Sequence, residues 1–268
     1  MAGEAAAAQT QILAVLHDER AHGDRLPHAG SGLGAQPYVL AHAVSTEVAR
    51  RLRGPRALRV LGSGRGAVHL DLDGFVVTLT APGVPRMPNG VAVGRVGDTL
   101  RVGWDPEAPP LWDPVVVPVA GGPAQVGEIA GWLAGRTSPP DLTLTDAPGR
   151  LLGRGPGLTP EGDDVLAGAA IGVRALGRAA GIEPAAIDAL AASLCPADAA
   201  ARTGALSATL LRLAARGAAP EPAHRLLGSS DREAALTDLR RLGASTGAAI
   251  ASGIALAARS LAPATRPH

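Results

Sequence analysis

Aromatic residues and cysteine are both scarce in this chain of 268 residues. Aromatic residues make up 2% of the sequence although hydrophobic residues make up 46%, which predicts a core of Ala, Val and Leu in which helices pack closely. The single cysteine, Cys195, excludes an internal disulfide framework and fits the reducing conditions of the cytoplasm. A lone thiol beside Pro196 is also more often inert than nucleophilic. We therefore expect a cytoplasmic protein with a large core of small side chains.

The sequence also lacks the features that mark several kinds of partner. Lys and Arg total 25 against 24 Asp and Glu, and no basic and aromatic array suggests nucleic acid. The N-terminus carries Glu4 and no basic region, so it is a poor signal peptide. The most apolar run, Leu242 to Ala258, is shorter than the roughly 20 residues of a membrane span and predicts a buried helix. The histidines do not have zinc-site spacing. We expect no nucleic-acid, membrane or zinc partner.

The N-terminal half is expected to be rich in strands. Helices are predicted over about 5–20 and 38–53, the second ended by Gly54-Pro55. The Asp73-Gly74 pair between two apolar runs predicts a hairpin, and a second tight turn is predicted at 96–98. Between Ala57 and Val119, six short runs are predicted as strands: ALRVLG, AVHLDL, FVVTLT, VAVGRV, TLRVGW and VVVPVA.

The pattern changes after Gly121-Gly122 and becomes helical. A short helix, GEIAGWLAGR, is followed by a turn-rich stretch and then by helices near 160–180, 184–194, 197–217, 231–242 and 245–260. The fold class is therefore α+β, with a β-rich N-terminal half preceded by two helices and an all-helical C-terminal half. We predict a domain of residues 1–122 and an α-helical domain of residues 123–268, with an active-site loop at their junction.

The densest cluster of unusual residues is the segment 153–164, which reads GRGPGLTPEGDD. Its alternating glycines allow a ligand to approach the main chain, and the following Thr-Pro-Glu is typical of a helix start. A glycine loop that leads into a helix presents free N–H groups and the positive end of the helix dipole. The segment therefore predicts a site for phosphate or carboxylate.

The acidic pair Asp163 and Asp164 in the same turn complicates this prediction, because a carboxylate repels a bare anion. A Mg²⁺ ion could bridge a phosphate and one Asp, or the ligand could carry an amide or carbamoyl NH₂ beside its anionic end. A structural interpretation also stands, since acids in a first turn stabilise a helix. Successive residues on a helix point about 100° apart, so only one Asp is expected to face the site.

The same segment, continued as GRGPGLTPEGDDVLAG, resembles the signature of the AllH-like family, G-x-G-x-G-L-T-P-x-G-D-D. MPNG at 87–90, TGALSATLL at 203–211 and GASTGAAIASGI at 243–254 are also similar to the family, in the expected order. The family includes the third subunit of a heteromeric oxamate carbamoyltransferase of anaerobic allantoin degradation. This chain has Ala244 and Ala249 where relatives often carry His and Asp, which leaves its acceptor substrate open.

The resemblance implies transfer of a carbamoyl group between an amide-like substrate of the oxalurate or oxamate type and phosphate, by a subunit that acts with partner subunits or as a homo-oligomer. It implies that Asp163 or Asp164 is catalytic, as a base or as the group that orients the NH₂. Substrate- or anion-binding positions are expected in the glycine loop and in the other family-like stretches: Gly153, Arg154, Gly155, Gly157, Leu158, Thr159, Gly162, Asn89, Ser207, Ser245, Thr246 and Gly247.

A purely structural role is also open for several of these positions. Asn89 before Gly90 is also a turn former, and Ser207 is also suited to close helix packing. Two other functions stay open: a Mg²⁺-dependent enzyme that binds phosphate or a nucleotide at the Asp163–Asp164 pair, and a non-catalytic subunit that completes the active site of a partner.

Overall fold

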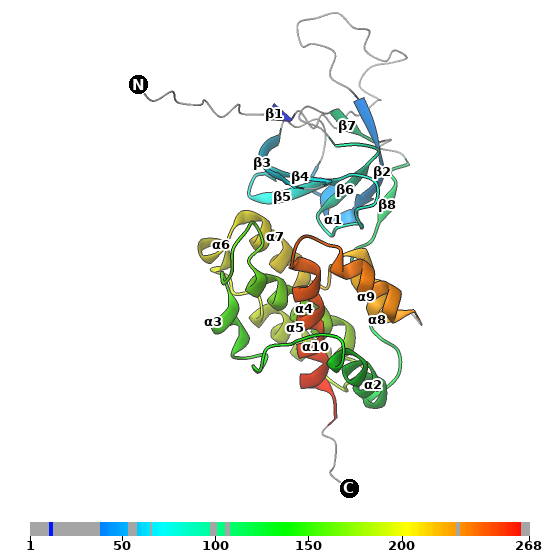
Figure 1. Ribbon diagram of the computed structural model, residues 1–268, viewed down its shortest axis with the longest axis vertical. Helices are drawn as coiled ribbons and strands as arrows, with labels where there is room; N and C mark the ends of the chain where they lie inside the picture. Colours follow the sequence, from blue (N-terminus) through cyan, green and yellow to red (C-terminus); the bar gives the residue numbers. More distant parts are fainter. Residues whose placement is uncertain are drawn as a thin grey trace, which may run out of the picture. The chain divides into compact units, whose positions relative to one another are not determined.

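The computed structural model describes residues 11–12, 38–52, 58–64, 66–96, 101–104, 108–228 and 231–263. The chain forms two compact units, the first of Met1–Val84 and Gly90–Trp112, the second of Pro85–Asn89 and Asp113–His268. The described strands and the short helix α1 lie in the first unit, and the other described helices lie in the second (Figure 1). The α+β class is thus confirmed.

Within the described residues, the first unit contains a sheet of eight strands. Its path runs β1-β3-β4-β5-β6-β2-β7, and β8 also pairs with β2. The pairs β5–β6, β2–β7 and β2–β8 are parallel, and the others are antiparallel. Five of the six predicted runs fall on strands. The strands are β1 (Gln11–Ile12), β2 (Tyr38–Ser45), β3 (Leu58–Gly64), β4 (Ala67–Leu72), β5 (Phe75–Thr80), β6 (Gly90–Val93), β7 (Arg101–Gly103) and β8 (Leu111–Trp112).

The predicted hairpin at Asp73-Gly74 is confirmed. Leu72 pairs with Phe75 across the turn between β4 and β5. Asp73 and Gly74 have φ values of 51° and 81°, as the central residues of a type I′ turn require. The second predicted turn, at 96–98, falls mostly outside the described residues.

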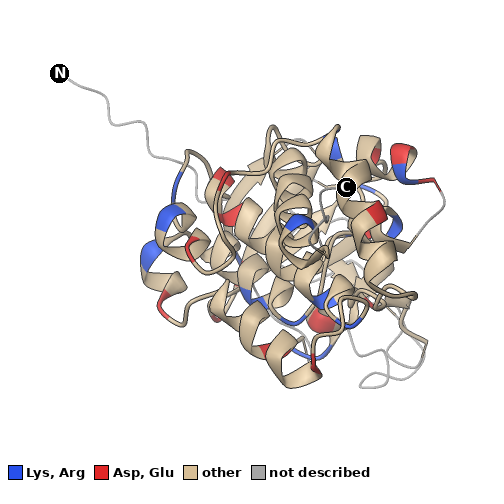
Figure 2. Ribbon diagram, turned by 90° about the horizontal axis from the view of Figure 1, so that it is seen from below, with Lys and Arg blue, Asp and Glu red and all other residues tan. Residues whose placement is uncertain are grey.

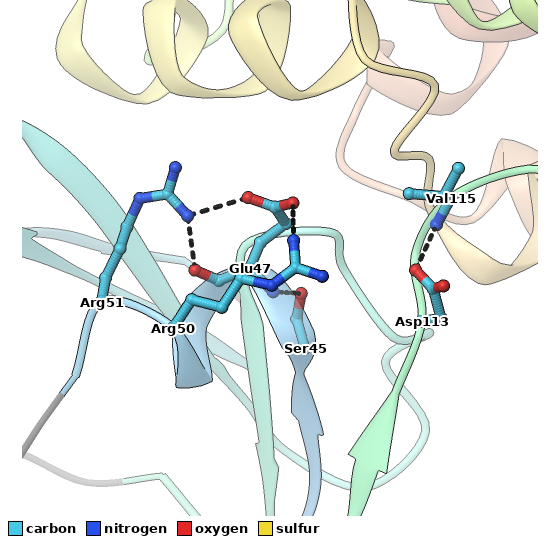
Figure 3. Close-up of polar contacts among 6 residues, drawn as sticks. All are labelled: Ser45, Glu47, Arg50, Arg51, Asp113 and Val115. Atoms are coloured by element: carbon cyan, nitrogen blue, oxygen red, sulfur yellow. Dashed lines mark hydrogen bonds and ion pairs between the residues drawn. The ribbon is translucent and has the colours of Figure 1, made fainter.

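The predicted helix over 38–53 is wrong, because its first half is the strand β2. Exposure alternates along β2: Leu40 is 62% exposed, whereas its neighbour Ala41 is buried. Pairing with β6, β7 and β8 outweighs the weak helix preference of the sequence. The helix α1 (Thr46–Ala49) begins only after Ser45, whose hydroxyl accepts a hydrogen bond from the Glu47 N–H at 3.2 Å (Figure 3). Of the predicted helix over 5–20, only residues 11–12 are described, and they form β1.

A buried carboxylate links α1 to the sheet. Glu47 is 5% exposed and accepts hydrogen bonds from Arg50 at 3.1 Å and Arg51 at 2.8 Å (Figure 3). The Arg51 guanidinium also lies 4.4 Å from the ring centroid of Phe75, at the start of β5. The two arginines therefore compensate the negative charge of the buried Glu47 side chain.

The prediction of a strand over 115–120 is also wrong. This segment forms only an isolated bridge, between Val115 and Ala218. The segment belongs to the second unit and is bonded within it, since the Val116 N–H donates to the Gly217 carbonyl at 2.9 Å. Pro114 and Pro118 have no N–H group, so the segment cannot support a regular ladder.

The second unit is helical, as predicted. Five predicted helices correspond to α2, α4, α5, α9 and α10, but the single helix predicted over 197–217 breaks at Thr203-Gly204 into two. The short helices α3 and α8 were not predicted. The helices are α2 (Pro123–Ala134), α3 (Ala147–Leu151), α4 (Glu161–Leu176), α5 (Pro184–Ser193), α6 (Ala199–Arg202), α7 (Ala205–Ala214), α8 (Glu221–Gly228), α9 (Arg232–Arg240) and α10 (Thr246–Leu261).

The helix α4 is the centre of this unit and is buried without interruption from Gly162 to Val173. Its closest neighbour is α10, and glycines bring the two backbones together. A Cβ atom on Gly168 would lie 2.1 Å from the Ile250 carbonyl oxygen, and one on Gly253 would lie 2.0 Å from the Val165 carbonyl oxygen. Their contact therefore depends on residues without side chains, as the scarcity of aromatic residues predicts.

The helices α4, α7 and α10 run in the same direction. The Thr159 and Thr246 hydroxyls are 3.0 Å apart at the start of α4 and α10, and Gly172 lies against Ala257 near their ends. The Thr203 hydroxyl donates to Asp163 where α7 and α4 begin. At the ends of the same two helices, Arg174 Nε donates to the Ala215 carbonyl at 2.6 Å. The three N-termini thus meet at one end of the second unit.

The surface agrees with the balanced charge of the sequence. Figure 2 shows acidic and basic residues interspersed along the helices rather than gathered by sign. Within the described parts of the chain, no helix is both long enough and apolar enough to cross a bilayer. The apolar run ending at Ala258 forms most of α10, which is buried as predicted.

A methyl group at position 168 tests the contact between α4 and α10. We expect Gly168→Ala to lower the free energy of unfolding by about 1–3 kcal/mol, because the backbones must separate to admit the new Cβ atom. Gly131→Ala in α2 is the matched control: no atom lies within 4 Å of its Cβ position, so the change should stabilise the helix by about 0.5–1 kcal/mol. Urea denaturation measures both. Equal effects of the two substitutions would contradict the close contact.

Candidate functional site

The glycine loop is held tightly against its surroundings by close backbone contacts. Gly153 has φ 73°, and a Cβ atom there would lie 2.4 Å from the Arg202 carbonyl oxygen. A Cβ atom on Gly162 would lie 2.1 Å from the Leu151 carbonyl oxygen. The Gly162 N–H also donates to the Arg154 carbonyl at 2.9 Å. These glycines fix the path of the loop, because a side chain at either position would clash with a backbone carbonyl group.

The three helices that start beside this loop have no side-chain caps. Their N-cap residues are Pro160 for α4, Gly204 for α7 and Ser245 for α10, and none makes a side-chain cap hydrogen bond. The first N–H groups of a helix have no partner within the helix, and each N-terminus carries the equivalent of about half a positive charge. Three parallel, uncapped N-termini therefore make this end of the unit attractive to an anion.

Asp163 connects separate segments of the chain at this end of the unit. It is 2% exposed, and its two oxygens each accept a hydrogen bond from a different segment. Oδ1 accepts from the Gly153 N–H at 2.7 Å, and Oδ2 accepts from the Thr203 hydroxyl. The carboxylate thereby joins the loop, the start of α4 and the connection between α6 and α7.

Asp164 is equally buried but differently arranged. It is 2% exposed, and its Oδ2 atom has no hydrogen-bond partner among the described residues. Burial raises the pKa of this carboxyl to about 7, although the hydroxyls of Thr246 and Thr159 favour the charged form, and the charges of Asp163 and Glu161 raise the pKa further. Asp164 is thus a buried acid that exchanges a proton near neutral pH. As the helix geometry predicts, the two Asp side chains have different neighbours.

The structure brings several other predicted residues to the same end. Thr159 and Thr246 are hydrogen-bonded to each other, and the Leu158 carbonyl oxygen would lie 3.5 Å from a Cβ atom on Gly204, at the start of α7. The side chain of Leu158 is 51% exposed. Arg154, Gly155, Gly157 and Ser245 are exposed as well. An open, partly apolar loop therefore lies over the helix starts.

Gly247 and Ser207 are buried next to these starts. A Cβ atom on Gly247 would lie 1.6 Å from the Leu239 carbonyl oxygen, so this glycine seats α10 on the end of α9. Ser207 is 1% exposed, and its hydroxyl has no partner among the described residues. Leu211 and Ala214, one and two turns later, belong to the core, which places Ser207 on the core-facing side of α7.

Asn89 comes from the sequence region of the strands but belongs to the second unit. It is fully buried and lies in the turn after Met87, which packs against the helical core. In the same segment, the Arg86 carbonyl accepts a hydrogen bond from the Glu221 N–H at 3.0 Å. The structure places Asn89 in the same unit as the loop.

Thr203 was not among the predicted site residues, although it contacts Asp163. The family-like stretch 203–211 begins with this threonine, directly before a helix start, and this position was the available signal. Its hydroxyl completes the hydrogen bonding of Asp163. Residues that orient a carboxylate in this way are hard to find without knowledge of what lies opposite.

The cysteine and the carboxylates of this unit bear on two other chemistries, thiol and metal chemistry. Burial raises the pKa of the half-buried Cys195 thiol, which disfavours the reactive thiolate, as expected for an inert cysteine. Within the described ranges, no three His, Cys, Asp or Glu side chains form a group suited to a metal ion. Both Asp163 oxygens already accept hydrogen bonds from the protein.

Comparison with protein families gives a match over this part of the chain. Residues 151–258 match the family described as oxamate carbamoyltransferase subunit AllH. The matched segment covers less than half of the chain, and it runs from the end of α3 through most of α10. It therefore contains the glycine loop and the starts of all three parallel helices. The AllH-like resemblance inferred from the motif is confirmed over this segment. Comparisons with curated proteins and with solved structures gave no match.

The protonation of Asp164 is tested by the pH dependence of stability. Its folded pKa of about 7 lies above its ordinary value of 3.8, so the native state holds a proton that the unfolded chain releases between these values. The stability is complete below about pH 4 and is lost as the pH rises through 7, by up to about 4 kcal/mol. We expect Asp164→Asn, which stays neutral, to be more stable than the wild type at pH 8 but not at pH 4.5.

Urea midpoints measured from pH 4.5 to 8 provide the comparison. Glu161→Gln is the matched control: this first-turn acid is exposed and acts on Asp164 only through its charge, so its gain should be much smaller. A constant stability difference between Asp164→Asn and the wild type across the range would contradict the assignment.

Proposed function

We propose that this chain is a subunit of a carbamoyltransferase that moves a carbamoyl group between an amide-like substrate of the oxalurate or oxamate type and phosphate. The carrying observation is the coincidence of the AllH match with one end of a helical unit, where three uncapped helix N-termini meet a buried Asp with an unpartnered oxygen. This combination suits a ligand with an anionic end and a neighbouring NH₂ group.

The phosphate or the substrate carboxylate would bind at the helix starts and the N–H groups of the loop, near Gly155 and Gly157, with the exposed Arg154 close in sequence. In the degradative direction, a phosphate oxygen forms a bond to the carbamoyl carbon of oxalurate. The bond from that carbon to the amide nitrogen breaks, and the nitrogen takes a proton to give oxamate. Catalysis of this kind can rest on positioning and on stabilisation of charge.

The two acids would have different roles in this reaction. Asp164 would orient the NH₂ group and exchange the proton with the nitrogen, because it has an unpartnered oxygen and titrates near pH 7. Asp163 would be a positioning residue, because its oxygens hold the loop and Thr203. Partner subunits are part of the proposal, since the matched family is described as a subunit.

Ligand protection against heating tests the ligand class. We expect phosphate and carbamoyl phosphate to raise the melting temperature of the purified chain without Mg²⁺, because the helix starts bind the anion directly. Protection by a nucleotide only with Mg²⁺ would instead support the metal-dependent phosphate or nucleotide enzyme. A ligand effect that needs a copurifying partner would support a subunit that completes the partner's active site.

Substitution of the two acids tests the roles. With copurified partner subunits, we expect Asp164→Asn to lower the rate of carbamoyl phosphate formation from oxalurate about 10²–10⁴-fold, because an amide cannot exchange the proton. Phosphate protection should remain. Glu161→Gln should change the rate less than about twofold, since an exposed side chain on the same turn contributes little. Full activity of Asp164→Asn would refute the role of Asp164.

A further inference from the structure

We propose that a plain anion and the ionised form of Asp164 exclude each other at the helix starts, so that binding of the anion carries a proton onto Asp164. This coupling would make the site proton-linked. It rests on the proposed function only for the location of the ligand at this end of the second unit.

The position of Asp164 makes the two charges close neighbours. It is the fourth residue of α4, and the hydroxyls that act on it come from the loop, at Thr159, and from the first residue of α10, at Thr246. These hydroxyls are themselves hydrogen-bonded at 3.0 Å. Asp164 therefore lies where the loop and two helix N-termini meet, and an anion bound there would be beside its carboxyl.

Burial prevents water from screening this pair of charges. Asp164 is 2% exposed, and its Oδ2 atom has neither solvent nor a hydrogen-bond partner among the described residues. Like charges in such surroundings repel strongly, and the cheaper state is one in which the carboxyl is neutral. A neutral carboxyl also gains an O–H group, which can donate to an anion oxygen.

No described cation stands beside Asp164 to hold it ionised. The charges that act on it are Asp163 and Glu161 of its own helix, and both oppose its ionisation. The helix α10 has no charged side chain before Arg259. At the end of α9, which carries the start of α10, Arg241 pairs with Asp238 at 2.9 Å and Arg240 donates to the Arg136 carbonyl. On the loop, Arg154 is exposed.

The proton balance follows from these charges. In the free protein, the carboxyl titrates close to pH 7. A bound anion moves this titration upward, and by reciprocity the proton strengthens the binding of the anion. Above neutral pH the protein must therefore take up one proton per anion, whereas below pH 6 it already holds this proton. A ligand that offers an NH₂ group to Oδ2 needs no such uptake.

Sulfate is a suitable probe because it stays a dianion from pH 6 to 9, whereas phosphate itself titrates there. Calorimetric titration of the full chain with sulfate should show a dissociation constant that rises up to about tenfold per pH unit above pH 7. Near pH 8, titration in two buffers of different ionisation enthalpy should show uptake that approaches one proton per sulfate. This second measurement needs no variant.

Asp164→Asn should bind sulfate with nearly the same affinity at pH 6 and pH 9 and without proton uptake. Glu161→Gln, the exposed acid on the same turn, should keep the wild-type slope. Absence of sulfate binding at every pH, a flat wild-type profile, or a wild-type slope in Asp164→Asn would each overturn the proposal. Proton-linked sulfate binding in a protein without carbamoyl transfer would leave this inference standing while the proposed function fails.

Discussion

The second unit depends on the contact between the backbones of α4 and α10. Glycines at 168 and 253 allow each helix to lie against the carbonyl groups of the other, at distances that any side chain would prevent. This contact fixes the two helices in register and in the same direction. Because the Thr159–Thr246 hydrogen bond joins their starts, the register of the core also sets the geometry at the end where the glycine loop lies. Packing and site are consequences of the same constraint.

Adjacent acids in one helical turn have separate uses in this protein. Both oxygens of Asp163 accept hydrogen bonds from within the protein, from the Gly153 N–H and the Thr203 hydroxyl, and this stabilises the shape of the loop. Asp164 keeps one oxygen unpartnered and a pKa of about 7, which suits proton exchange. The difference arises from the turn of the helix, which directs Asp163 towards the start of α7 and places Asp164 beside the hydroxyls of the loop and of α10.

The sequence was informative where local chemistry decides the structure. Asp73-Gly74 requires a tight turn whatever surrounds it, and the long buried helices α4 and α10 have a clear apolar pattern. Residues 38–45 were misassigned because their strand is made by pairing with β6, β7 and β8, which no local pattern records. The motif also located the candidate loop, because its glycines and the helix start after them are recognisable from neighbouring residues alone. Thr203 was missed because its importance lies in a contact with Asp163, 40 residues away.

Parallel helices that lie side by side place like ends of their dipoles together, which is unfavourable unless something opposes it. Nature usually relieves this with Ser, Thr, Asp or Asn at the N-cap, yet α4, α7 and α10 begin at Pro160, Gly204 and an idle Ser245. Two of these positions thus lack a capping side chain, and the third carries a serine that makes no cap hydrogen bond. An anion bound here, as proposed, would take the place of the missing capping side chains, so capping residues at these positions are expected in relatives that do not bind it, even where the glycine loop itself is kept.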